Sequence, residues 1–232
     1  MATPSHARTT LDHDLQVIRD DVLRLGSLVE QSLERAFAAF KTHDASLAQD
    51  VINDDQVIND LRYKAEHEIT STVALQQPMA HDLRLLVASL IIANELERMG
   101  DHMEGIARTV LRQPAEPGAE IPAQLLDMRQ VALRMLREAM DAYLAEDVER
   151  ASLIAETDNQ VDALYQDLFT MLVNQMGQGA LSVERGTYLL WAGHNLERYA
   201  DRVTNICERV IYLGTGRTGG GLNPKPGESS EG

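Results

Sequence analysis

The sequence predicts an all-α protein, a tandem duplication of two antiparallel three-helix bundles with six long helices. Three observations support this prediction. Apolar residues recur at alternating spacings of three and four, which is the period of one helix face. Aromatic residues make up only 4% of a chain that is 44% hydrophobic, a composition typical of helical bundles. The hexad Leu-Glu-Arg-x-x-Asp occurs at 96–101 and again at 196–201, which indicates an internal repeat.

The first repeat is expected to cover residues 9–112, after a flexible N-terminal segment at 1–8. Its first helix follows a heptad-like series: Leu11, Leu15, Ile18, Val22, Leu25, Val29, Ser32, Ala36 and Phe40. A second helix is predicted from about Ala45 to Leu75. Pro78, which suits the first turn of a helix, then precedes the third. The third helix has its own series: Leu85, Ser89, Ile92, Leu96, Met99, Met103, Ile106 and Val110.

The linker at 113–122 is rich in proline, which cannot continue a helix, and the second repeat is expected at 123–213. Its first two helices are predicted at 125–144 and at 149 to about 176. Gly177-Gln178-Gly179 then separates them from a helix with this series: Leu189, Ala192, Leu196, Tyr199, Val203, Ile206, Val210 and Leu213. From Leu196 to Val210 these positions match those of the third helix one for one. Residues 214–232, rich in Gly, Pro and Ser, are expected to be disordered.

Charge and composition exclude several classes of protein. The formal net charge of −15 disfavours a nucleic-acid partner and fits either cation binding or docking onto a basic protein. Cys207 is the only cysteine, as expected in a reducing compartment. The start of the chain has no apolar signal region, and the longest apolar stretch, Leu83–Ala93, is too short to span a bilayer. We therefore expect a soluble, cytoplasmic protein.

The repeated hexad places two carboxylates on one helix face in each repeat. Glu97 and Asp101, and again Glu197 and Asp201, stand at positions i and i+4, where Cβ atoms are about 5–6 Å apart. Both pairs lie beside the apolar series, about 100° around the helix, where they are partly shielded from water. Two carboxylates in such a place repel each other unless a positive group neutralises them.

A second set of oxygen ligands is predicted on the neighbouring helices. Asp158 and Asp162 form another i, i+4 pair, and Asp55 and Asn59 are their counterparts in the first repeat. Each bundle then presents four oxygen-bearing side chains from two helices, as carboxylate metal sites in bundles do. Oxygen ligands favour hard cations such as Mg²⁺ or Mn²⁺, with iron also compatible, and His194 would add a nitrogen in the second bundle. The second site, with Asp in place of Asn, is expected to be the tighter one.

Three alternatives stay open from the residues alone. The acid pairs can be ordinary solvated helix faces. They can also pair with Arg98 and Arg198 as a structural network in a metal-free helical adaptor. A carboxylate-bridged di-metal enzyme is the third, although no Glu in the chain is followed by His three residues later. The chain also lacks a phosphate loop, a nucleophile elbow and HExxH, so a non-enzymatic protein is favoured.

The sequence resembles the PhoU family of phosphate-uptake and phosphate-signalling regulators. The resemblance rests on three segments and on the two-fold layout: LERMGD followed by His102, PMAHDLR at 78–84, and LERYADRVTNICERVIYLGTG at 196–216. It implies paired three-helix bundles, usually dimeric, that bind multinuclear iron, or zinc, manganese or magnesium, at E(D)xxxD motifs. The motif residues carried over are Glu97, Asp101, Glu197 and Asp201, with Asp158 and Asp162 as accessory acids.

The resemblance also implies a function. Members of this family repress the phosphate-starvation response by acting between the ATPase-driven phosphate ABC transporter and a membrane sensor histidine kinase. We therefore expect a negative regulator of phosphate homeostasis that is cytoplasmic, or peripheral at the inner membrane. The first repeat departs from the second in two places, Asn59 against Asp162 and Glu104-Gly105 against Thr204-Asn205. These departures predict that the two sites differ in metal affinity.

Overall fold

The computed structural model describes residues 4–112 and 120–217, with side chains from Arg8 onward. Within these ranges every regular element is a helix, as predicted. The helices are α1 (Pro4–Thr42), α2 (Ala45–Gln76), α3 (His81–Arg112), α4 (Ala123–Ala145), α5 (Val148–Glu156), α6 (Asp158–Gly177) and α7 (Val183–Thr215). Helix α1 begins at Pro4, ahead of the expected start at residue 9. Residues 113–119 of the predicted linker and 218–232 of the predicted tail lie outside the described ranges.

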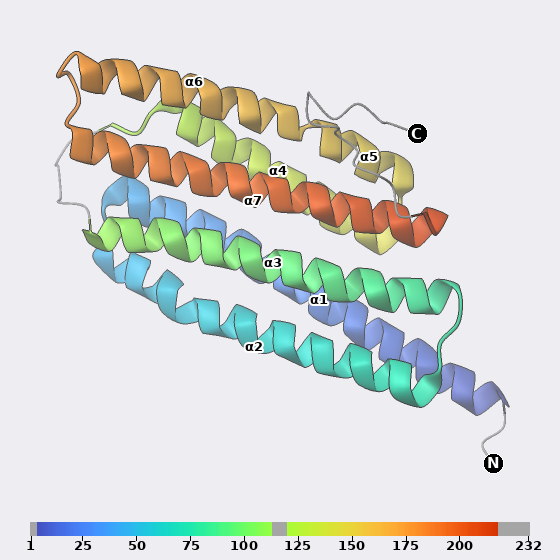
Figure 1. Cartoon of the computed structure of the whole chain (residues 1–232). Helices are drawn as coiled ribbons and strands as arrows, with labels where there is room; N and C mark the ends of the chain where they lie inside the picture. Colours follow the sequence, from blue (N-terminus) through green and yellow to red (C-terminus); the bar gives the residue numbers. More distant parts are fainter. Residues whose placement is uncertain (1–3, 113–119, 218–232) are drawn as a thin grey trace.

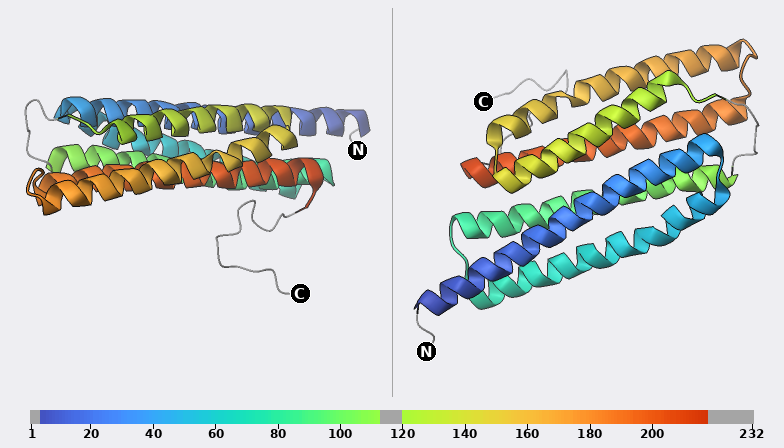
Figure 2. Two further views of the ribbon diagram at one scale, coloured as in Figure 1. Left: turned by 90° about the horizontal axis from the view of Figure 1, so that it is seen from above. Right: turned by 180° about the vertical axis from the view of Figure 1, so that it is seen from behind.

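The helices form two three-helix bundles that pack side by side, which confirms the predicted architecture. Helices α1, α2 and α3 make the first bundle, and α4, α5 with α6, and α7 make the second (Figure 1). Helices α3 and α7 run antiparallel along the middle of the molecule, with α2 and α6 at its outer edges. Helices α1 and α4 lie on one side of this layer, as the view from behind shows (Figure 2). None of the helices in the described ranges could span a lipid bilayer.

The apolar series of the sequence form the core. All members of the α3 and α7 series are buried, and in α1 only Ser32 of the predicted series is partly exposed. Ser89 is the polar member of the α3 series. Its hydroxyl donates to the Leu85 carbonyl at 2.7 Å and shares a 2.6 Å hydrogen bond with the Tyr143 hydroxyl of α4. A buried serine is tolerated here because its hydroxyl is satisfied.

The helix expected from residue 149 to 176 is interrupted at Thr157. The Thr157 hydroxyl donates to the Leu153 carbonyl at 3.2 Å, and the Asn159 amide donates to the Glu156 carbonyl at 3.0 Å. Short polar side chains at this place bond to the backbone. The chain turns between α5 and α6, and Asp158 is the first residue of α6.

The seam between the bundles is polar where α3 meets α7. The Glu95 carboxylate accepts hydrogen bonds from Arg202 at 3.2 Å and from Asn205 at 3.0 Å. At the position related by the repeat, the Asn195 side chain hydrogen-bonds to His102. A charged contact and a neutral contact thus occupy equivalent places on the two sides of the repeat.

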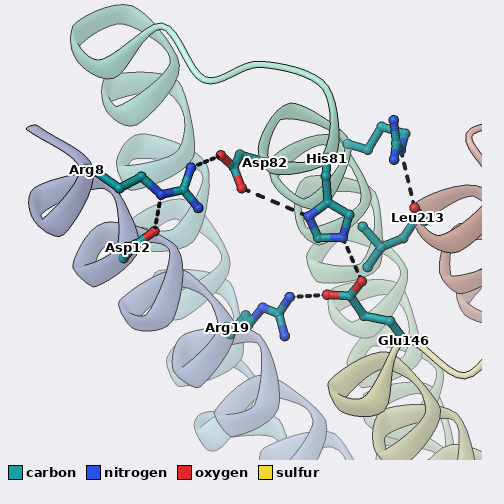
Figure 3. A network of polar contacts seen from close by, with 8 residues as sticks. Arg8, Asp12, Arg19, His81, Asp82, Glu146 and Leu213 are labelled. Carbon is teal, nitrogen blue, oxygen red and sulfur yellow. Dashed lines mark hydrogen bonds and ion pairs between the residues drawn. The ribbon is translucent and has the colours of Figure 1, made fainter. Parts of the chain in front are cut away.

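A second network joins the bundles at the N-terminal end of α3 (Figure 3). Glu146, which follows α4, forms ion pairs with Arg19 of α1 and, at 2.7 Å, with His81 of α3. The neighbouring Asp82 pairs with Arg8 at 2.6 Å. Through Glu146 this network joins the end of α4 to α1 and α3, whereas the Arg8–Asp82 pair lies within the first bundle.

Candidate cation site

The first acidic cluster lies between α2 and α3 and contains Asp55, Asn59, Glu97 and Asp101. The Asn59 amide donates to Asp55 Oδ2 at 2.8 Å. Burial, followed by the negative charges on α3, raises the pKa of Asp55 to about 6. Burial and the Glu97 charge also raise the pKa of Asp101. The structure therefore brings the four predicted side chains of the first repeat into one electrostatic group.

The second acidic cluster lies between α6 and α7 and contains Asp158, Asp162, Glu197 and Asp201. Burial, followed by the charges of its three neighbours in the cluster, raises the pKa of Asp158 to about 7. This rise is larger than that of Asp55, because Asp158 is more buried and has the Asp162 carboxylate where Asp55 has the Asn59 amide. All eight residues predicted from the sequence thus fall into two groups of four.

Asp158 is the most unusual member of either cluster. Its side chain is only 8% exposed, and its Oδ1 atom is buried without a hydrogen-bond partner. A buried carboxylate oxygen without a partner costs free energy, so a native structure keeps one only where something else compensates. Such an oxygen fits a site that a cation or a hydrogen-bond donor completes.

The donor chemistry fits a hard divalent cation, but the side chains are not gathered around one. Within the described ranges, no three His, Cys, Asp or Glu side chains already converge closely enough to hold a metal ion. Binding at either cluster would therefore require side-chain rotation. Asp158 and Asp162, on the first turns of α6, and Glu197 and Asp201 on α7 are the residues that would hold the ion in the second bundle.

The basic side chains beside the second cluster do not neutralise it tightly. Arg198 Nε is 3.9 Å from Asp201 Oδ2, and His194 Nδ1 is 3.6 Å from Glu197 Oε2. Neither contact is the bidentate pairing that a structural network of arginines would show. His194 does lie at the cluster, as the sequence suggested, and its ring is 6.2 Å from that of Tyr165.

Two further residues contribute to the first site: Glu104, which the sequence analysis noted as a departure but not as a ligand, and Gly100, which it did not single out. Glu104 adds to the negative potential at Asp55 and forms a 2.5 Å ion pair with Arg108. Glu104 lies on the same helix face as Glu97 and Asp101, and this spacing in the sequence could have identified it as part of the site. Gly100 allows the close approach, because a Cβ there would lie 3.1 Å from Asp55 Oδ1. The sequence pattern predicted that these two helices are neighbours, but not that Gly100 would face Asp55.

The lone cysteine does not resemble a nucleophile. Cys207 is buried in the core of α7, and burial raises the pKa of its thiol to about 12. A thiol in that state is not a thiolate at neutral pH and acts as packing.

The protein thus consists of two tandem three-helix bundles. Each bundle carries an acidic cluster, between α2 and α3 in the first and between α6 and α7 in the second, and these features define a class of duplicated helical proteins. The sequence model of the PhoU domain matches residues 22–110 and 125–210, and the chain belongs to the PhoU family.

Individual relatives agree with this assignment. The chain is 32% identical to a phosphate-specific transport system accessory protein PhoU homolog of Clostridium acetobutylicum, over 90% of this chain and 96% of the relative. The crystal structure of the phosphate transport system regulatory protein PhoU from Streptococcus pneumoniae superposes with a TM-score of 0.85 at 33% identity, covering 90% and 99% of the two chains. PhoU from Pseudomonas aeruginosa gives 0.82 at 32% identity, covering 89% and 99%.

Proposed function

We propose that this protein is a non-enzymatic accessory regulator of phosphate uptake. In this role it represses the phosphate-starvation response by coupling the ATPase of a phosphate ABC transporter to a sensor histidine kinase. Its relatives are an accessory protein and a regulatory protein of phosphate transport, and this supports the first part. The coupling to the kinase, a homodimeric state and a cytoplasmic or peripheral membrane location come from the family resemblance.

The acidic clusters are proposed to act in this regulation by binding divalent cations. The observation that carries this proposal is the buried Asp158 Oδ1, which lacks a partner and lies among three further carboxylates. Mg²⁺ or Mn²⁺ suits such a set of oxygen ligands, with iron or zinc as the other metals that the family resemblance implies. When bound, the cation would neutralise the repulsion between the acids and join the cluster to an acidic group on a partner.

Calorimetric titration of the chelator-treated protein with Mn²⁺ and Mg²⁺ tests the cation site. We expect Glu197→Ala/Asp201→Ala to weaken the tighter site at least about tenfold, since two of its charged ligands are lost. Asn59→Asp, which gives the first cluster a fourth carboxylate, is expected to strengthen the weaker one. Equally negligible binding by the wild type and both variants would refute the cation proposal.

Capture of the transporter ATPase or the kinase tests the regulatory role. The full-length protein is used as bait in extracts of phosphate-replete cells, with and without chelator. Loss of either partner on chelation is the expected result. Retention of both with chelator present would separate docking from cation binding, and absence of both under all conditions would contradict the regulatory role itself.

A further inference from the structure

Thr204 lies on α7, about one turn beyond the acids of the second cluster. Glu197, Asp201 and Thr204 are separated by four and three residues, so they lie along one face of the helix. The Oγ1 atom of Thr204 is buried and has no hydrogen-bond partner among the residues that the structure describes. The hydroxyl of a helical threonine commonly bonds to a backbone carbonyl of the preceding turn. The orientation of the Thr204 hydroxyl therefore needs an explanation.

Other helical threonines show the common arrangement. The Thr187 hydroxyl, on the same helix, donates to the Val183 carbonyl at 2.7 Å. The Thr109 hydroxyl, on the related helix α3, donates to the Gly105 carbonyl at 3.0 Å. The Thr204 hydroxyl makes no bond of this kind within the described part of the chain, so its oxygen is left for a ligand.

Helices α5 and α6 follow one another along α7 in a single antiparallel register (Figure 1). A Cβ at Gly214 would lie 2.5 Å from the Val148 side chain at the start of α5, and one at Gly186 would clash with the Met176 side chain near the end of α6. These two contacts are separated by the same number of residues in both segments. The alignment is therefore kept between them, across the break at Thr157.

This register places Asp158 opposite Thr204, and the charges near Asp158 agree with it. Burial raises the pKa of Asp158, and the Asp201 charge adds to the rise. Burial also raises the pKa of Cys207, and the Asp158 charge adds to that rise. Thr204 lies between Asp201 and Cys207 on α7. Asp158 Oδ1 and Thr204 Oγ1 are thus two buried oxygens at one contact of α6 with α7, and neither has a partner within the described ranges.

The first bundle has a carboxylate, Glu104, at the position of Thr204. After burial and the Asp101 charge, the Glu104 charge raises the pKa of Asp55, so the side chain at this position faces the first cluster. Arg108 binds Glu104 at 2.5 Å, whereas α7 has Glu208 at the position of Arg108. The first bundle thus pairs this position with its own arginine, and the second does not.

We propose that the Thr204 hydroxyl is a ligand of the cation in the second bundle, which binds at the buried end of the cluster between Asp158 Oδ1 and Thr204 Oγ1. The inference rests on the cation site proposed above, and it specifies where the ion lies and which neutral ligand it has. A hydroxyl oxygen suits a hard cation, as the Ser or Thr hydroxyl of phosphate-binding loops does for Mg²⁺. One ion would satisfy both oxygens.

Calorimetric titration with Mn²⁺ tests this ligand. The parent is the full-length chain with Glu97→Ala/Asp101→Ala, in which only the second cluster is intact. Thr204→Val keeps the shape of the side chain and should weaken Mn²⁺ binding about tenfold, since a polar contact to the ion is lost. Thr204→Ser keeps the hydroxyl and should bind as the parent does. Thr187→Val, on an exposed part of the same helix, is the matched control and should leave binding unchanged.

Thermal unfolding in chelator separates a ligand from a packing residue. Without a cation, Thr204→Val exchanges a buried hydroxyl that lacks a partner for a methyl group. Its unfolding midpoint, followed by circular dichroism, should therefore equal or exceed that of the parent. A lowered midpoint would attribute the loss of Mn²⁺ binding to packing and would overturn the proposal.

Thr204→Cys reports on ligation directly, because a thiolate prefers softer ions than Mn²⁺. The variant should bind Cd²⁺ more tightly than the parent and gain an ultraviolet sulfur-to-cadmium charge-transfer band. The parent, whose only thiol is Cys207, is the control. Absence of this band, or equal Mn²⁺ affinity of Thr204→Val and the parent, would overturn the proposal and leave the cation site itself standing. Failure of the parent to bind Mn²⁺ at all would overturn the second cation site together with this ligand.

Discussion

The two bundles are copies of one plan, and the structure shows where each copy has kept it and where it has changed. The buried series of α3 and α7 match position by position, but the polar residues beside them do not. Glu95 meets Arg202 on one side of the seam, whereas the related Asn195 meets His102 on the other. Asp55 has an amide beside it, whereas Asp158 has a carboxylate. The two repeats thus share their buried positions and differ in the polar residues beside them.

The largest effect on stability is expected at the seam between α3 and α7. Glu95 and Arg202 are only 14% and 13% exposed, so Glu95→Ala would leave a largely buried guanidinium without its counter-charge. We expect a loss of about 2–3 kcal/mol in the free energy of unfolding. Asn195→Ala, which removes a neutral hydrogen bond to His102, should cost only about 1 kcal/mol.

Urea denaturation of the two single variants at pH 7 measures this contrast. His102 is suited to the neutral side, because burial, only partly opposed by the hydrogen bond to Asn195, lowers its pKa to about 4. Equal losses for the two variants would show that the charged contact contributes no more to stability than the neutral one. That result would contradict the proposed difference between the two sides of the seam.

A smaller effect on stability is expected from the packing between α6 and α7. Gly193 lets α7 approach Leu168, since a Cβ there would lie 2.6 Å from the Leu168 side chain. The first bundle has Ala93 and Ala65 at the matching positions, both buried. Gly193→Ala should therefore destabilise the protein by about 1–2 kcal/mol through overpacking, less a gain in helix propensity.

A double-variant cycle identifies the cause of that loss. In Gly193→Ala/Leu168→Ala the pair becomes the one found in the first bundle, and the new methyl group fills part of the space that Leu168 leaves. The double variant should be less destabilised than the sum of the two single variants, measured by urea denaturation. Additive losses would mean that the two residues do not share this space.

The periodic part of the molecule could be predicted from the sequence. The series from Leu11 to Phe40 has a single helical period, and residues at i and i+4 share a face, so the core and the acid pairs followed directly. The neighbours of each helix were harder to predict. Nothing in the local pattern around Glu95 shows that Arg202 will face it. The sequence around Thr157 likewise carries no proline or glycine that would predict the break between α5 and α6.

The smallest effect is expected at Asp158 and Asp55, and it concerns how the free energy of unfolding depends on pH. An aspartate whose pKa is raised in the folded protein holds its proton there while the unfolded chain has already released it. The free energy of unfolding therefore falls as pH rises through the interval between the two pKa values. For Asp158 that interval runs from about 3.8 to about 7, and for Asp55 from about 3.8 to about 6.

In chelator at pH 8, Asp158→Asn should accordingly stabilise the protein by about 1 kcal/mol, with a smaller gain from Asp55→Asn. The gain at Asp158 is reduced because a negative charge at the first residue of α6 also interacts favourably with the helix dipole. At pH 4, where the wild-type Asp158 is protonated, the difference from wild type should vanish. Thermal unfolding from pH 4 to 8 measures this. A stabilisation that is larger for Asp55→Asn, or independent of pH, would mean that repulsion within the second cluster is not what distinguishes it from the first.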